Sequence, residues 1–255
     1  MYTAESRAMV ATNVTFMVLA MLSVILRFEV RRPKALVLEL DDYLILTALF
    51  FAAALAITNI VGVFAAGFGT PFESLSDAKG TAFLKVLFVM QFWYILAVAL
   101  VKFSILCLYG RIFSTGRSFK VGIKIMILLT GAWLVSFLFA TFFQVWPLWC
   151  NWIVCAPTTN YPVMYVCSSV TDIVLDISIL CIPVSYIRQL QMSSVQKAAT
   201  SSIFGLGIFC IVSSIARLVY TVRFMQGNIE LSYNQGNYAV NFDGKLSTHS
   251  TTSSA

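Results

Sequence analysis

The chain has 255 residues and a net charge of +6, and 59% of its residues are hydrophobic while only 11% are charged. Soluble domains carry about 25% charged residues. This composition excludes a soluble protein, because a chain this apolar could not cover its surface with polar groups. The length suits one bundle of six or seven membrane-spanning helices. We therefore predict an all-α, polytopic transmembrane helix bundle.

Six apolar stretches are long enough to cross a bilayer, since a spanning helix needs about 20 mostly apolar residues. Short segments rich in charge, glycine or proline separate them, and none of these segments could house a soluble domain. The predicted domains are a helix bundle over residues 1–223 and a polar tail over 224–255, which we expect to be disordered. The predicted spans are residues 9–28, 43–66, 82–109, 122–146, 163–187 and 201–222.

Basic residues are distributed unevenly between the two sets of loops. The loops after the first, third and fifth spans carry ten lysines and arginines, whereas the N-terminal segment and the alternate loops carry two. Loops rich in Lys and Arg stay on the cytoplasmic side. We therefore predict a multi-pass protein of the plasma membrane or an endomembrane, with its N-terminus on the non-cytoplasmic side.

Ionisable side chains inside the spans are few, and such groups normally face the interior of a bundle. Asp172 and Asp176 lie four residues apart on the fifth span, so they share one helix face. Arg217 of the sixth span lies at a depth that matches Asp172, which predicts an ion pair between them or an outward-facing polar pocket. The candidate pocket or buried network consists of Asp172, Asp176, Arg217, Lys102, Tyr165, Ser169 and Ser213.

Lys102 and the acid pair leave several arrangements open. The long stem of Lys102 could extend to the cytoplasmic surface, or the ammonium could pair with Asp176 or with Asp41 and Asp42 at the start of the second span. Two adjacent carboxylates repel when both ionise, so one of them could keep a proton and serve as a general acid. The alternative is that Lys102 or Arg217 neutralises the pair.

Histidine and cysteine limit the remaining chemistry. The single histidine, His249, lies in the polar tail, which excludes a histidine-based metal site or catalytic triad inside the bundle. We expect neither a metal nor a cofactor. Cys150 and Cys155 lie in an outer loop, where oxidation is permitted. We predict that they are oxidised, to each other or with a partner such as Cys167; two free thiols are the alternative.

Four phrases along the spans carry a family resemblance. In order and spacing they resemble the fungal rhodopsin-domain integral membrane proteins, a Pth-eleven-like, GPCR-like family. The resemblance implies seven helices, so the last helix, expected after about residue 235, is missing or truncated here. Opsins hold retinal on a lysine of that last helix, so we expect no retinal on Lys102. The phrases are LDDYLIL at 40–46, LVKFSILCLYGRIF at 100–113, TDIVLDISILCIPVSYIRQLQM at 171–192 and KAATSSIFGLGIFCIVSSIARL at 197–218.

Topology and resemblance together favour a receptor-like protein rather than an enzyme. It would bind a small ligand or a surface cue on the outer side and contact a cytoplasmic signalling partner; we expect the lipid bilayer as its surroundings and no nucleic acid. The alternative is a membrane enzyme of secondary metabolism, similar to a terpenoid cyclase, with Asp172 or Asp176 as the general acid. A transporter is less well supported, because the spans lack the repeats and broken helices typical of that class.

Overall fold

The computed structural model describes residues 4–31, 40–68, 76–112, 117–152 and 161–187, together with individual residues between 205 and 222. These parts of the chain are helical apart from short turns and contain no strand, which confirms the predicted all-α fold. The elements are α1 (Ala4–Arg31), α2 (Leu40–Val61) with a π-helical turn (Gly62–Ala66), α3 (Asp77–Ile112), α4 (Arg117–Phe142), a short 3₁₀ turn (Leu148–Asn151) and α5 (Tyr161–Ile187).

Five helices of the described chain are long and apolar enough to cross a membrane. They match the first five predicted spans, and the third is longer than predicted. The sixth predicted span, 201–222, is helical at each position that the structure describes. The predicted tail over 224–255 lies outside the described residues. The apolar spans are Ser6–Leu26, Leu40–Ala66, Ala78–Arg111, Phe119–Phe142 and Val163–Ile182.

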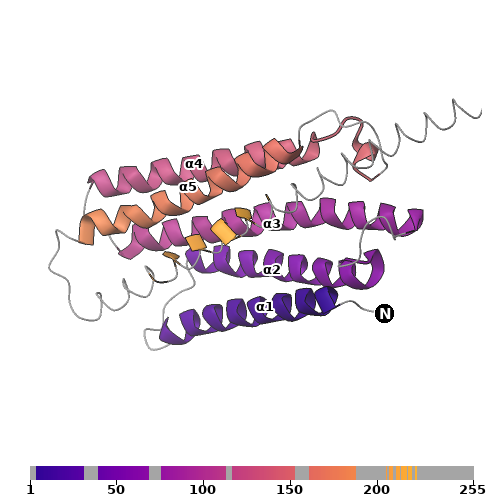
Figure 1. Ribbon diagram of the computed structural model, residues 1–255. Helices are drawn as coiled ribbons and strands as arrows, with labels where there is room; N and C mark the ends of the chain where they lie inside the picture. Colours follow the sequence, from indigo (N-terminus) through magenta and orange to yellow (C-terminus); the bar gives the residue numbers. More distant parts are fainter. Residues whose placement is uncertain are drawn as a thin grey trace, which may run out of the picture.

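Successive helices run in opposite directions, so α1, α3 and α5 all begin at one end of the bundle (Figure 1). We call this the N-terminal end, and the end where α2 and α4 begin the opposite end. The long helix α3 packs against α2, α4 and α5, whereas α1 packs mainly against α2. Helix α3 is therefore the central element, because it contacts three of the other four described helices.

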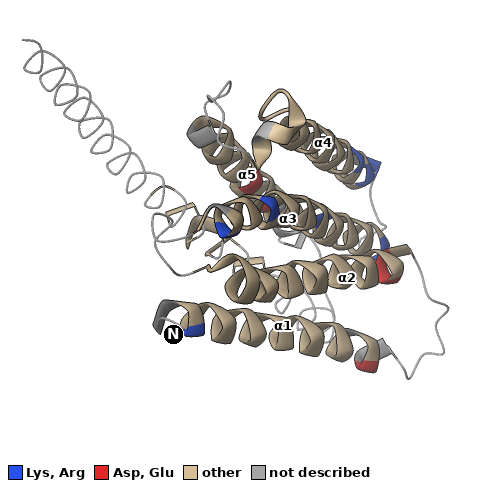
Figure 2. Ribbon diagram, turned by 90° about the vertical axis from the view of Figure 1, so that its right-hand side faces the viewer, with Lys and Arg blue, Asp and Glu red and all other residues tan. Residues whose placement is uncertain are grey.

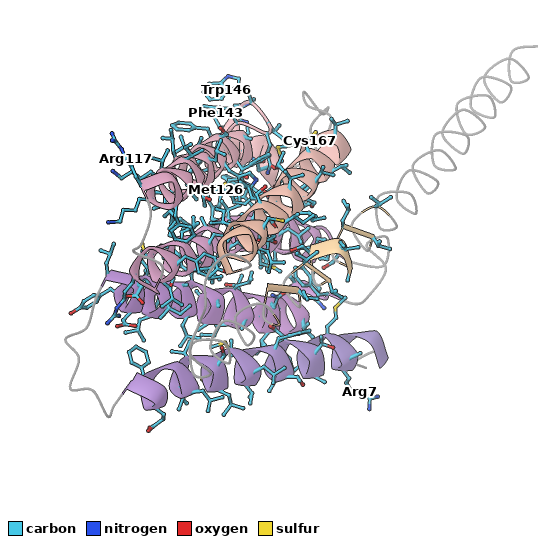
Figure 3. The ribbon with its side chains drawn as sticks, turned by 90° about the vertical axis from the view of Figure 1, so that its left-hand side faces the viewer. Arg7, Arg117, Met126, Phe143, Trp146 and Cys167 are labelled. Atoms are coloured by element: carbon cyan, nitrogen blue, oxygen red, sulfur yellow. The ribbon has the colours of Figure 1, made fainter. Side chains whose placement is uncertain are left out.

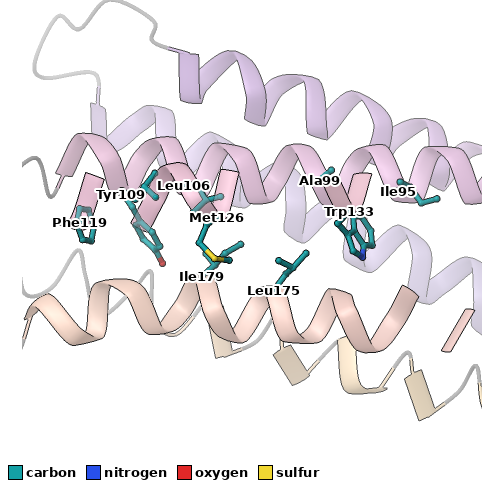
Figure 4. Packing of buried hydrophobic residues seen from close by; sticks show 10 residues of the cluster. Ile95, Ala99, Leu106, Tyr109, Phe119, Met126, Trp133, Leu175 and Ile179 are labelled. Atoms are coloured by element: carbon teal, nitrogen blue, oxygen red, sulfur yellow. The ribbon is translucent and has the colours of Figure 1, made fainter. Parts of the chain in front are cut away.

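The core lies where α3, α4 and α5 meet (Figure 4). On α3 the buried residues Ile95, Ala99, Leu106 and Tyr109 recur every three to seven positions, which is the spacing of one helix face. Lys102 falls in the same register and is only 3% exposed. Its backbone position therefore directs its side chain into the bundle, among apolar neighbours.

Large apolar side chains cover the outside of the bundle. Leu26, Phe50, Leu128 and Phe139 are each at least 60% exposed, as expected for surfaces that face hydrocarbon. Because lipid tails are as apolar as leucine side chains, moving these side chains from lipid into a helix interface contributes little free energy of association. Close packing and polar contacts between helices must therefore contribute more than they would in a soluble bundle.

Candidate functional site

Lys102 of α3 forms ion pairs with both acidic residues of α5. Its Nζ lies 3.0 Å from Asp172 Oδ1 and also contacts Asp176 Oδ1. The same ammonium donates a hydrogen bond to the backbone carbonyl oxygen of Asp172 at 3.1 Å. The Lys102 and Asp172 side chains are each 4% exposed, and that of Asp176 is 16% exposed. The cation that meets the acid pair thus comes from the third helix; Figure 2 shows basic residues on α3 and an acidic residue on the adjacent α5.

Local helix geometry explains this arrangement. Side chains on a helix tilt toward its N-terminus, so Lys102 on the core face of α3 extends toward the N-terminal end of the bundle. Asp172 and Asp176 are four residues apart and lie one above the other on α5. One ammonium can therefore reach both carboxylates.

Hydrogen bonds extend the cluster along the interface between α3 and α5. The Tyr94 hydroxyl donates to Asp172 Oδ2 at 3.2 Å, and the Ser214 hydroxyl, from the sixth predicted span, donates to Asp176 Oδ2 at 3.1 Å. Nearer the N-terminal end, the Gln91 amide donates to the Tyr165 hydroxyl. Polar groups therefore recur along the interface from the first turns of α5 down to Lys102, and we call them the polar series.

Two buried acceptors in this series receive no hydrogen bond from the described part of the chain. They are Gln91 Oε1 and Asp172 Oδ1. Asp172 Oδ1 interacts with Lys102 through charge, at 3.0 Å, without the alignment of a hydrogen bond. A buried acceptor without a donor costs about 1–3 kcal/mol; Gln91 Oε1 bears this cost in full, whereas the Lys102 ammonium offsets it at Asp172 Oδ1. Both atoms are therefore suited to accept a hydrogen bond from a bound molecule or a water.

The predicted site residues are only partly gathered here. Tyr165 enters through Gln91, and Ser169 is buried on α5 at 5% exposure. Arg217 and Ser213 lie outside the described residues, so the proposed pair between Asp172 and Arg217 stays a prediction. The Lys102 side chain does not extend to the membrane surface, because its ammonium is held between the two carboxylates.

Asp41 and Asp42 are buried elsewhere, at the start of α2, each 3% exposed. Asp41 Oδ1 lies 3.8 Å from an Arg111 guanidinium nitrogen, and its backbone carbonyl oxygen accepts a hydrogen bond from Ser104 at 2.9 Å. Lys102 therefore pairs with α5 rather than with Asp41 or Asp42, and a separate set of contacts joins α2 to the end of α3.

The candidate set from the sequence did not include Tyr94, Gln91 or Ser214. A signal for the first two was present, because residues 91, 94, 98 and 102 follow the three- and four-residue spacing of one helix face. Ser214 adjoins the predicted Ser213, and nothing in the sequence chose between two adjacent serines.

The predicted disulfide lies largely outside the described residues. Cys155 and the Cys150 side chain are not described, so their pairing stays a prediction. Cys167 has a free, exposed thiol in the structure. The alternative bridge to Cys167 is therefore not formed there.

Comparison with known proteins agrees with the helical architecture. The chain is 29% identical to a SAT4 family membrane protein of Emericella nidulans over 163 residues, 62% of this chain and 42% of that relative. It thus spans less than half of that relative's length. It is 26% identical to Phomoidride biosynthesis cluster protein H, from a fungus designated Fungal sp., over 204 residues, 68% of this chain and 72% of the relative. No solved structure matches the chain.

The model of the fungal rhodopsin domain family matches residues 26–240, which is most of the chain. This range includes all the residues of the Lys102, Asp172 and Asp176 cluster and four of the five described spans. The chain belongs to the fungal rhodopsin-domain family of integral membrane proteins.

Proposed function

We propose that this protein is a receptor-like membrane protein that binds a small, hydrogen-bond-donating molecule from the outer side. The proposed site lies between α3 and α5, beside Asp172. The observation that carries the proposal is a pair of buried acceptors, Gln91 Oε1 and Asp172 Oδ1, that accept no aligned hydrogen bond from the described chain, although Lys102 provides the charge partner of Asp172 Oδ1. A hydroxyl or amine group would satisfy this oxygen without displacing Lys102.

The polar series along the interface supports entry from the N-terminal end. It begins at Gln91 and Tyr165 and continues through Tyr94 to Asp172. The bias of lysine and arginine between the loops favours the non-cytoplasmic side for this end. A ligand from outside would therefore meet polar groups before it reached the charged cluster.

The position of α3 suggests how binding could act at a distance. This helix contacts α2, α4 and α5, and near its opposite end Arg111 pairs with Asp41 of α2. A ligand can shift a conformational equilibrium only if it binds one state better than the other. A donor at Asp172 that changes how the carboxylate holds Lys102 would favour one placement of α3 against α5.

The proposal is tested with the full chain in nanodiscs and pairs of natural products that differ only in a hydroxyl or its methyl ether. Compounds with the free hydroxyl should raise the melting temperature of the wild type, and their methyl ethers should raise it by a smaller amount. The triple variant Lys102→Met, Asp172→Asn, Asp176→Asn should lose this difference. Compounds that stabilise both proteins equally would place binding elsewhere and contradict the proposal.

A second candidate is a membrane enzyme of secondary metabolism with Asp172 or Asp176 as the general acid. The name of the relative from a phomoidride biosynthesis cluster favours it. The geometry favours it less, because both carboxylates accept contacts from Lys102 and from a hydroxyl. Such groups act as acceptors rather than proton donors. If Asp176→Asn abolished a metabolite conversion in a fungal host while the protein stayed folded, the enzyme would replace the receptor.

A further inference from the structure

The start of α4 carries three exposed cations on one face. Arg117, Lys120 and Lys124 are separated by three and four residues, which at 3.6 residues per turn places them within an arc of about 60°. No described residue forms an ion pair with any of the three. Arg117 extends away from the ribbon at the opposite end of the bundle from Arg7 (Figure 3).

The same face becomes apolar immediately below the cations. Leu128 and Val135 are 73% and 53% exposed, and both lie within about 20° of Arg117 around the helix axis. Going down this face from the start of α4, two turns of positive charge are followed by about two turns or more of aliphatic surface. This order matches a phospholipid, whose charged headgroup lies above its acyl chains.

Lys124 lies inside the apolar span of α4, where no described residue forms an ion pair with it. The apolar span of α4 begins at Phe119, so Lys124 lies about 7.5 Å inside it at 1.5 Å per residue. It faces outward rather than into the bundle. Because side chains tilt toward the helix N-terminus, the Lys124 ammonium extends back to the level of the phosphates.

We propose that this face of α4 is a binding site for one anionic phospholipid of the cytoplasmic leaflet. Arg117, Lys120 and Lys124 hold its headgroup, with the positive end of the helix dipole adding to the field, and an acyl chain lies along Leu128 and Val135. Basic residues next to an anionic leaflet attract its lipids. The aliphatic surface below the cations distinguishes a lipid from a free phosphate, because a free phosphate has no acyl chain to pack against it.

The test measures lipid binding to the purified full chain in detergent by native mass spectrometry. Dioleoyl phosphatidylserine should bind in preference to dioleoyl phosphatidylcholine. The variant Lys120→Gln, Lys124→Gln should bind phosphatidylserine about thirtyfold more weakly, from roughly 1 kcal/mol per basic residue. The matched control Arg7→Gln, Lys79→Gln removes the same charge from exposed sites at the other end and should leave binding unchanged.

Further variants and probes separate this site from simple charge effects. Lys120→Arg, Lys124→Arg should keep the preference, and its melting temperature, like that of the glutamine pair, should stay near the wild-type value. Equal binding of the two lipids, or an equal loss in the control pair, would overturn the proposal. Glycerophosphoserine that bound as tightly as the intact lipid would also overturn it, because the apolar face would then contribute nothing.

Discussion

Lys102→Met removes the one cation that the described structure places between Asp172 and Asp176. The ammonium contacts both carboxylates and the Asp172 carbonyl oxygen, so the variant leaves Asp176 Oδ1 and that carbonyl oxygen without their donor and Asp172 Oδ1 without its counter-charge. Methionine keeps a similar length and fits an apolar core. The loss of stability therefore reports the charge rather than a cavity.

The expected magnitude separates an ionised pair from a simple polar contact. Breaking a buried ion pair by removing one partner costs about 3–5 kcal/mol, whereas hydrogen bonds between membrane helices average about 0.6 kcal/mol. We expect the larger value, because Lys102 and Asp172 are almost completely buried. Tyr94 and Ser214 each still donate to one carboxylate and keep the cost from rising further.

The assay is reversible unfolding by SDS in mixed micelles, which gives the free energy of unfolding. Lys85→Met is the matched control on the same helix; Lys85 is exposed and lies 5.9 Å from the Trp152 ring centroid, a contact that contributes about 0.5–1 kcal/mol. Adding Asp172→Asn and Asp176→Asn to Lys102→Met removes the unpaired charges and should restore most of the stability. A Lys102→Met loss no larger than that of the control, or a triple variant no better than the single, would refute the ion-pair reasoning.

Three further predictions concern topology, oxidation and packing. A cysteine placed at residue 120 should resist impermeant thiol reagents in intact cells, and labelling from outside would reverse the predicted orientation. Cys150 and Cys155 should be found oxidised by mass spectrometry after free thiols are blocked; recovery of both as alkylated thiols without reduction would exclude the bridge. Gly207→Leu should lower the melting temperature, because a Cβ there would collide with a leucine of α5, whereas Gly205→Leu meets open space; equal effects of the two would contradict this packing.

The possible role of Arg217 is tested with the same unfolding assay. If Arg217 pairs with Asp172, Asp172→Asn should destabilise the protein because it leaves Arg217 without its partner, and adding Arg217→Gln should partly restore the stability because the double variant removes both charges. A double variant worse than the two single losses combined would show that Arg217 belongs to a different set of contacts.

The spans and the acid pair could be predicted from the sequence because both depend on local pattern. Runs of about 20 apolar residues mark spans, and the four-residue interval alone places Asp172 and Asp176 on one face. The sequence also indicated that Lys102 points inward, because it shares the helix face of Ile95, Ala99 and Leu106. Its side chain is nevertheless long enough to reach the membrane surface, so the sequence allowed both arrangements.

The partner of Lys102 could not be predicted, because it depends on how two helices are offset. Counted from the predicted starts of their spans, Lys102 lies 11 residues, or about 16 Å, deeper than Asp172. In the structure Gln91 of α3 meets Tyr165 in the first turns of α5, so α5 begins well below the start of α3 and most of that difference vanishes. Lipid-facing apolar surfaces give no information about such an offset, because an apolar helix has a similar free energy at many depths in the hydrocarbon.

The claim of an outward-facing site is tested most directly by comparing Tyr94→Cys with Phe139→Cys in a background without the native cysteines. The contact between the Phe92 and Phe142 rings, 4.5 Å apart, places the two positions at similar depth. Tyr94 lies in the polar series beside Asp172, whereas Phe139 is 60% exposed on the outside of α4. An impermeant thiol reagent applied outside intact cells should modify Tyr94→Cys and leave Phe139→Cys unmodified. Modification of Tyr94→Cys no faster than Phe139→Cys would contradict the existence of an outward-facing site.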